Sequence, residues 1–154
     1  MDKTCERLLL KEKSIMIDIK ELVLKKYTGS KFEFGNAPTN DDIKKSEKIL
    51  GVIFPSEFKE FVTQTGWLKL GNNYFFGIPL NLIEKGNSIS MTQFARTEWG
   101  LPKKYIVIYS SEDEVLWCME ENNNKVFSYD VNERNFIGTV ANSFEEALVD
   151  YIKG

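Results

Sequence analysis

The chain has 154 residues, of which 42% are hydrophobic and 13% aromatic, and its formal net charge is −3 at pH 7. A chain of this length buries about two-thirds of its unfolded surface on folding, which predicts a single globular domain over residues 1–154. The composition excludes a disordered or low-complexity protein. The negative charge opposes the clustered basic surface that nucleic-acid binding requires, so no direct nucleic-acid partner is expected.

The first residues resemble a targeting segment only superficially. Leu8–Leu10 follow two basic residues, but Lys11–Lys13 interrupt the apolar run far short of the roughly 20 residues of a membrane span, so no membrane partner is expected. Residues 1–13 are expected to be a frayed extension ahead of a core over about residues 38–154. A helix packed on the domain is predicted up to about Lys26 by apolar residues at helical spacing: Ile15, Ile19, Leu22 and Val23.

The next predicted helix is bounded by capping residues at both ends. Thr39 and Asp42 form a carboxylate variant of the capping box at its start, and Gly51 stands where a left-handed residue ends a helix. The spacing of the apolar residues predicts one buried face on this helix. That face is expected to contain Ile43, Ser46 and Leu50, with Ile49 and Ile53 extending its apolar side.

A second core helix is predicted after Pro55, whose fixed φ and missing N–H suit a first helical turn. Gly66 is its expected end, and an aromatic strand that closes on Gly77-Ile78-Pro79 is expected to follow. The buried face of the helix is predicted to consist of Phe54, Phe58, Phe61 and Val62.

From residue 67 onward the apolar pattern changes to that of short strands, which predicts an antiparallel sheet. Gly71-Asn72-Asn73 is expected to join a hairpin, and residues 81–100 to form a short helical or irregular crossover. Ser143 and Glu146 begin a terminal helix with a capping box. The predicted fold is therefore α+β, with N-terminal helices and a C-terminal helix packed on a sheet of about five to six strands. The predicted strands are Trp67–Leu70, Tyr74–Ile78, Lys104–Tyr109, Val115–Glu120, Lys125–Asp130 and Asn135–Val140.

The order of these elements resembles the SUKH superfamily, the Smi/Knr-type domain. The resemblance covers roughly residues 38–154. It rests first on the helix ending in Leu50-Gly51, on Phe54-Pro55, on Glu57-Phe58-Lys59-Glu60-Phe61, on the Gly66 stop and on Gly77-Ile78-Pro79. Later segments agree with it: Leu101-Pro102, Tyr105–Ile108, Val126–Asp130 and Ser143–Leu148.

The resemblance implies an α+β binding scaffold. Among bacteria, similar domains are best known as immunity proteins, which bind and neutralise a cognate toxin that is commonly a nuclease. In fungi a similar domain occurs in a regulator of cell-wall assembly. The expected function is therefore toxin immunity by stoichiometric occlusion. Regulation through protein–protein contacts, of the cell-wall or stress-response kind, is the alternative.

Residue types that commonly carry catalysis are scarce. The chain has no histidine, so the commonest general base and zinc ligand are missing. Cys118 lies in an apolar run, where a thiol serves core packing. Glu112–Glu114 are expected in a solvated turn rather than around one cation. No metal, cofactor or catalytic residue is therefore expected, and the protein is not expected to be an enzyme, although a pair of buried carboxylates remains an alternative.

The cysteine content indicates a cellular compartment. Cys5 and Cys118 form neither a disulfide framework nor a metal-ligand spacing, which favours a reducing cytoplasm. The sequence leaves the oligomeric state open between a monomer and a weak homodimer through an edge strand.

The stretch from Glu112 to Glu133 is acidic, with Lys125 as its only base. If its strands form one meander, their loops and one sheet face are expected to present a negative patch beside Tyr109 and Tyr129. Such acids also serve solubility in many proteins, which is the alternative explanation. The predicted toxin contacts are the acidic residues Glu112, Asp113, Glu114, Glu120 and Glu121, with Trp117 and Trp99 as aromatic anchors.

Overall fold

The computed structural model describes residues 16–79, 85–111 and 113–154. The whole of the expected N-terminal extension, residues 1–13, and Ile15 lie outside the described residues. The helices are α2 (Ile19–Lys26), α3 (Asn40–Leu50), α4 (Ser56–Thr65), α5 (Ser88–Trp99) and α6 (Phe144–Lys153), with a 3-10 turn at Gly29–Lys31. The strands are β1 (Phe32–Phe34), β2 (Leu68–Leu70), β3 (Asn73–Phe75), β4 (Tyr105–Ser110), β5 (Val115–Glu120), β6 (Val126–Asp130) and β7 (Asn135–Ala141).

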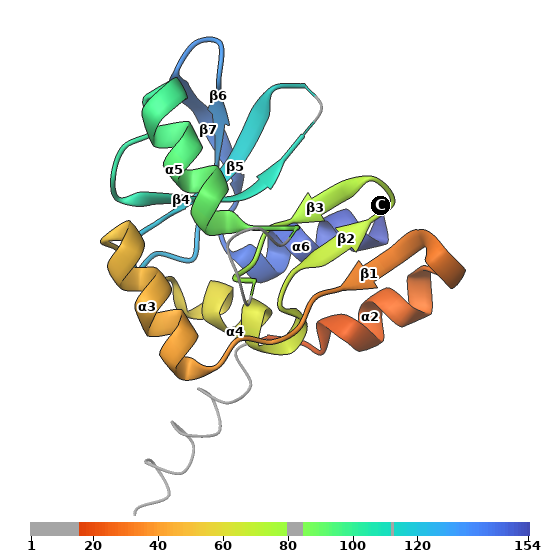
Figure 1. Cartoon of the computed structure of the whole chain (residues 1–154). Coiled ribbons are helices and arrows are strands. Elements are labelled where there is room, and N and C mark those ends of the chain that lie inside the picture. The colour runs from red at the N-terminus through yellow and green to blue at the C-terminus, as the bar shows by residue number, and fades with distance from the viewer. Residues whose placement is uncertain (1–15, 80–84, 112) are drawn as a thin grey trace, which may run out of the picture.

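The seven strands form one antiparallel sheet in the order β1-β2-β3-β4-β5-β6-β7 (Figure 1). Every strand neighbours the next one in sequence, so the predicted α+β class and antiparallel order are confirmed. The sheet gains its seventh strand from β1, in which Phe32 pairs with Leu70 and Phe34 with Leu68. The predicted strands begin at Trp67 and do not include β1, which lies far from β2 in the sequence and forms by pairing with it.

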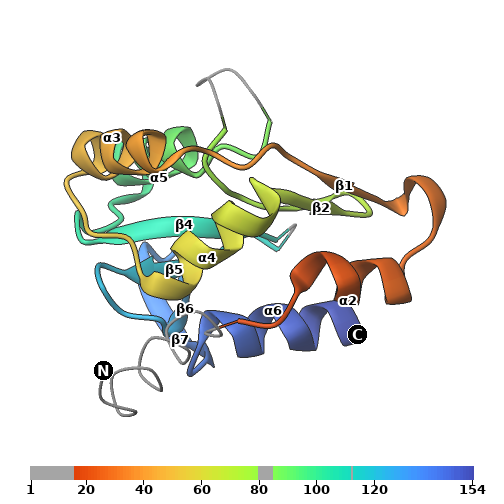
Figure 2. The ribbon, with the colours of Figure 1, turned by 90° about the horizontal axis from the view of Figure 1, so that it is seen from below.

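Two hydrophobic cores lie on the two faces of this sheet. The larger core joins the sheet to α2, α4 and α6, and its aromatic centre includes Phe61 and Phe144, whose ring centroids are 5.2 Å apart. Figure 2 shows α5 on one side of β4 and α6 on the other. The smaller core lies under α5 and contains Ala95, Leu101, Val107, Leu116, Cys118 and Tyr129.

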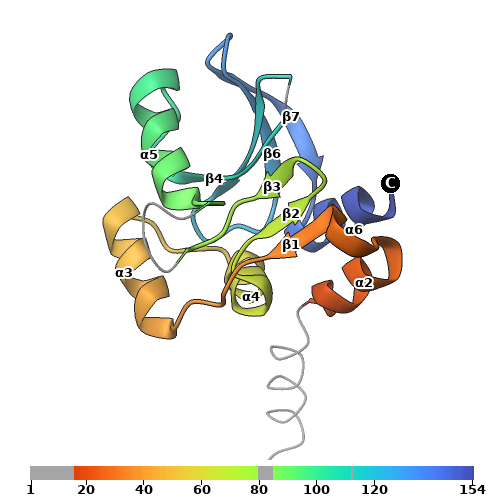
Figure 3. The same ribbon diagram turned by 45° about the vertical axis from the view of Figure 1, so that its right-hand side comes forward.

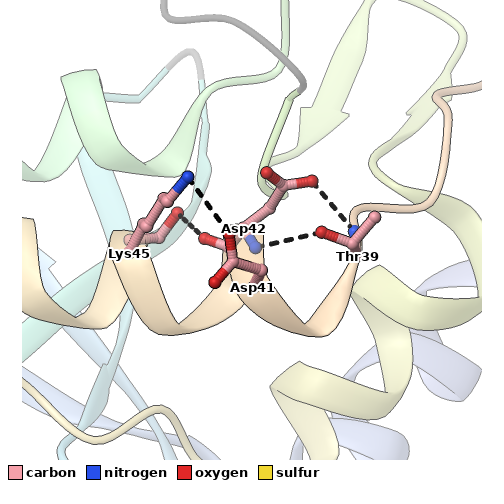
Figure 4. Close-up of polar contacts among 5 residues, drawn as sticks. Thr39, Asp41, Asp42 and Lys45 are labelled. Atoms are coloured by element: carbon pink, nitrogen blue, oxygen red, sulfur yellow. Dashed lines mark hydrogen bonds and ion pairs between the residues drawn. The ribbon is translucent and has the colours of Figure 1, made fainter.

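The capping box of α3 is confirmed in both directions. The Asp42 N–H donates to the Thr39 hydroxyl at 3.1 Å, and the Thr39 N–H donates to the Asp42 carboxylate at 3.0 Å (Figure 4). These bonds with Thr39 lower the pKa of Asp42, because they favour the charged carboxylate. Gly51 ends the helix at φ 68°, in the left-handed region. The local sequence thus fixes both ends of α3.

The predicted burial of α3 is partly wrong. Ile43, Ser46 and Leu50 are buried as expected, but the side chains of Ile49 and Ile53 are 51% and 53% exposed. Ile49 precedes Leu50 by about 100° of helical rotation, which turns it away from a narrow buried stripe. Ile53 follows the helix, and its backbone binds the β5–β6 loop instead.

The helix α4 follows its sequence pattern closely. Phe58, Phe61 and Val62 are fully buried, and Phe54 is 2% exposed. Pro55 is the N-cap residue, and Gly66 ends the helix at φ 74°. Residues 81–100, expected to be a short helical or irregular crossover, contain the twelve-residue helix α5. This helix carries Phe94 and Trp99, which form part of the candidate partner-binding surface.

Candidate partner-binding surface

Four acidic residues gather at one end of the sheet. Asp113 and Glu114 stand in the turn between β4 and β5, while Asp130 ends β6 and Glu133 lies in the turn to β7. Val115 pairs with Asp130 across the strands, which brings the two turns together. Two further hydrogen bonds join the turns. The Glu114 carbonyl accepts the Val131 N–H, and the Glu114 carboxylate accepts the Asn132 side-chain amide. We call Asp113, Glu114, Asp130 and Glu133 the acidic end. Glu112 lies outside the described residues.

The carboxylates of the acidic end are largely open to solvent. Asp113, Glu114 and Glu133 are exposed, while Asp130 is half-buried and accepts the N–H groups of Asn132 and Glu133, each at 2.9 Å. Arg134 is the one base among the described residues of these two turns. Four carboxylates against one guanidinium make a local negative potential, which attracts a basic partner over a distance of about 10 Å.

Glu120 and Glu121 lie at the opposite end of β5, about 17 Å away by the rise of a strand. There the Glu121 carboxylate accepts the Ile53 N–H at 2.9 Å and holds the α3–α4 connection. The Glu121 N–H donates to the carbonyl of Lys104, an exposed residue that, with Lys103, precedes β4. The backbone of an exposed lysine is thus in contact with the acids at this end. The fold thus divides the acids of the expected negative patch between the two ends of β5.

The two predicted tryptophan anchors lie on opposite faces of the sheet. Trp117 is half-buried on the larger-core side, where its ring centroid is 4.7 Å from that of Tyr109 and 6.1 Å from that of Tyr151. Trp99 ends α5 on the other face, and its carbonyl accepts the Tyr129 hydroxyl at 2.5 Å. Figures 1 and 3 both show one end of α5 near the β6–β7 turn. The bond from Tyr129, the residue before Asp130, ties the end of α5 to the strand that carries part of the acidic end.

Tyr109 and Tyr129 do not flank a surface patch as expected, because their side chains are only 5% and 1% exposed. Tyr109 packs in the larger core and Tyr129 in the smaller one, so neither side chain faces solvent. Phe94, which was not among the predicted contacts, is 50% exposed and meets Trp99 edge to face at a centroid distance of 5.0 Å. Recognising α5 as a helix would have placed Phe94 opposite its buried residues. Asp113, Glu114 and Trp99 are the predicted contacts that the fold brings together.

The packing of Cys118, Glu57 and Arg96 in the fold explains why their pKa values are shifted. Burial raises the pKa of the Cys118 thiol, which keeps it protonated and unreactive. Burial also raises the pKa of Glu57, whose carboxylate accepts the Glu145 N–H at 2.8 Å and caps α6. Arg96 donates to the carbonyls of Leu50 and Lys103, tying α5 to α3. These groups therefore hold the fold together.

Neither a metal-binding cluster nor a membrane-spanning helix is found among the described residues. In the ranges 16–79, 85–111 and 113–154, no group of three or more Cys, Asp or Glu residues is placed to hold a metal ion. Over the same part of the chain, no helix combines the length and apolarity needed to cross a membrane.

Comparisons with known proteins identify the fold and the family of the chain. The crystal structure of a protein from Pseudomonas syringae pv. tomato superimposes with a TM-score of 0.59 at 19% identity, covering 73% of this chain and 81% of that one, which shows a shared fold. No curated protein matches the chain. A family model, SUKH_5, described as SMI1-KNR4 cell-wall, matches residues 19–153. The chain therefore belongs to the SUKH_5 family of SMI1-KNR4 domains.

Proposed function

We propose that this domain is an immunity protein, which binds a cognate toxin domain in the cytoplasm of the producing cell and blocks it by stoichiometric occlusion. Membership of SUKH supports this proposal, because the family includes toxin immunity proteins and is generally non-catalytic. Inhibition by occlusion needs a stable, charged and partly apolar surface but no turnover. The acidic end beside Trp99 offers such a surface.

The single observation that carries the proposal is the gathering of four carboxylates beside an aromatic pair, exposed Phe94 and half-buried Trp99. Nuclease toxins bind phosphate in basic clefts, so a negative surface on the inhibitor speeds encounter with such a partner. Aromatic side chains then slow dissociation once water is excluded from around them. Trp99 and Phe94 lie where they would serve this purpose. A basic nuclease domain is therefore the proposed partner.

The size of the surface is consistent with tight binding. A standard interface buries about 800 Å² on each partner, a patch roughly 30 Å across. The α5 helix is about 18 Å long, so one such patch covers both this helix and the acidic end. An immunity protein must leave almost no toxin free, which implies a Kd below about 1 nM. Trp117, Glu120 and Glu121 fall outside this patch, and in this proposal they contribute little.

The alternative is a regulatory module that binds several partners weakly. The description of the matched family as SMI1-KNR4 cell-wall favours this candidate. A regulator needs only modest affinity for each partner, and its loss would not expose the cell to a toxin. The two functions therefore differ in the number of partners and in the strength of binding.

An affinity pull-down of the tagged protein from its own cells, followed by mass spectrometry, tests the proposal. The wash uses moderate salt, so that weak electrostatic contacts dissociate while a tight complex stays. We expect one partner at 1:1 stoichiometry that carries a toxic domain with a basic surface. Co-expression with this protein should then restore growth to cells that produce the toxic domain. Several weakly held partners would support the regulatory module instead.

A further inference from the structure

The outward face of α5 differs from that of the neighbouring helices. Its exposed residues carry only one charge, on Glu98, because Arg96 turns inward to bind backbone carbonyls of the α3 and β4 segments. On α2, α3 and α6 the exposed side chains are mostly charged. Depletion of charge marks the centre of a protein interface rather than an ordinary solvated helix. The exposed residues of α5 are Ser90, Gln93, Phe94, Thr97 and Glu98.

A groove opens beside the first half of this helix. Its volume is about 450 Å³, which is enough for a large aliphatic or aromatic side chain. Phe94 forms one wall and is 50% exposed, while Phe76 and Met91 supply further apolar surface. Among the described residues, the groove is lined by Phe76, Gly86, Asn87, Ser90, Met91 and Phe94.

Phe94 connects this groove to the acidic end. Its ring is in contact with Trp99 at an interplanar angle of 82°, and the Trp99 carbonyl accepts the hydroxyl of Tyr129, the residue before Asp130. Groove, aromatic pair and acidic end thus follow one another along a helix of about 18 Å. A partner drawn to the carboxylates would lie over the groove without any further movement.

We propose that the groove receives an apolar side chain from a basic toxin domain, whose Lys and Arg residues meet the acidic end. This inference rests on the proposed function and deepens it by naming the anchor site. Charge complementarity selects a basic partner, and the uncharged face of α5 is the desolvated centre of the contact. Phe94 is then the central anchor, surrounded by small polar residues such as Ser90 and Thr97.

The test uses the toxin domain that the wild-type chain captures, purified and titrated by calorimetry. Phe94→Ala should weaken the Kd by at least about 30-fold, as expected for an aromatic anchor. Met91→Glu, which places a charge at the groove, should weaken it similarly. Leu24→Ala is the matched control, because Leu24 is a 59% exposed apolar residue on a helix remote from the groove. It should change the Kd by less than about twofold.

The outcomes separate the two proposals. Tight binding by the wild type together with unchanged binding by Phe94→Ala and Met91→Glu would overturn the groove and leave the immunity function standing. Failure of the wild type to capture any toxin domain would overturn both. Light scattering gives a further check, since a wild-type dimer that Phe94→Ala converts to a monomer would assign the groove to a second copy of the chain. Circular dichroism confirms that each variant is folded.

Discussion

Gly77 packs directly on the backbone of Gly66, at the point where α4 ends. A Cβ added to Gly77 would lie 1.6 Å from the Gly66 carbonyl oxygen, and the same oxygen accepts the Ile78 N–H at 3.3 Å. The chain after β3 therefore crosses the end of α4 with no space for a side chain. This contact joins two of the motifs by which the sequence resembles its family, the Gly66 stop and Gly77-Ile78-Pro79.

Gly77→Ala should destabilise the fold severely. The new Cβ meets fixed backbone rather than a flexible side chain, so the loss in free energy of unfolding should exceed about 3 kcal/mol. Urea denaturation followed by tryptophan fluorescence measures it. Gly138→Ala is the control, because its Cβ would have ordinary contact at 3.9 Å with the Ser128 hydroxyl. Equal stability of the two variants would contradict the close approach.

The capping box of α3 makes a second prediction. Thr39→Ala removes the hydroxyl that accepts the Asp42 N–H and should lower the free energy of unfolding by about 1 kcal/mol. Thr63→Ala serves as the comparison, since Thr63 is exposed within α4 and its hydroxyl bonds only the preceding turn. Chemical denaturation of both variants measures the two free energies of unfolding. If Thr39→Ala is no less stable than Thr63→Ala, the cap contributes nothing.

Glu57 should make stability depend on pH. Burial raises the pKa of its carboxyl, so the folded state holds this proton more tightly than the unfolded chain does. The resulting stability is complete below the ordinary carboxyl pKa and is lost as pH rises through the raised value. Glu57→Gln keeps an acceptor for the Glu145 N–H but cannot ionise. Its stability relative to the wild type should therefore increase between about pH 4 and pH 7.

Denaturant titrations of both proteins across this pH range measure that difference. Glu33→Gln, the same substitution at an exposed position in β1, is the control for the loss of one carboxyl group. A difference between Glu57→Gln and wild type that is independent of pH would refute the assigned role of Glu57.

Cys118 should resist thiol reagents in the folded protein. Its side chain is fully buried in the core under α5, and burial raises the pKa of the thiol. The Cys5→Ser variant isolates this residue for labelling with a chromogenic disulfide. We expect labelling only as fast as the protein unfolds, and rapid labelling in denaturant. Fast stoichiometric labelling without denaturant would show that the thiol is accessible.

Much of the fold is predictable from the sequence because its signals are local. Thr39 with Asp42, Pro55 and Gly66 mark helix ends through backbone chemistry that needs no tertiary contact. The strands β4 to β7 are predicted to within one residue, since short apolar runs between polar turn residues indicate their limits. The three-residue β1 escaped recognition because its formation depends on pairing with β2.

The surface is much less predictable, because it depends on which residues the fold brings together. Glu114 and Glu120 are near in sequence, yet β5 separates them to opposite ends of the sheet. Asp113 and Glu133 are far apart in sequence but lie in adjoining turns. Phe94 is exposed only because α5 turns its other side to the sheet. The pattern of charge along the chain is therefore not enough to identify which acids form the acidic end.

The most direct test of the account is the rate at which the protein associates with its captured toxin domain. Reversing two exposed charges of the acidic end, as Asp113→Lys with Glu133→Lys, should slow association at least about tenfold at low salt and weaken its salt dependence. The control, Glu33→Lys with Asp150→Lys, makes the same change in net charge at exposed sites on β1 and α6. It should associate at close to the wild-type rate. Equal association rates for the two double variants would contradict binding through the acidic end.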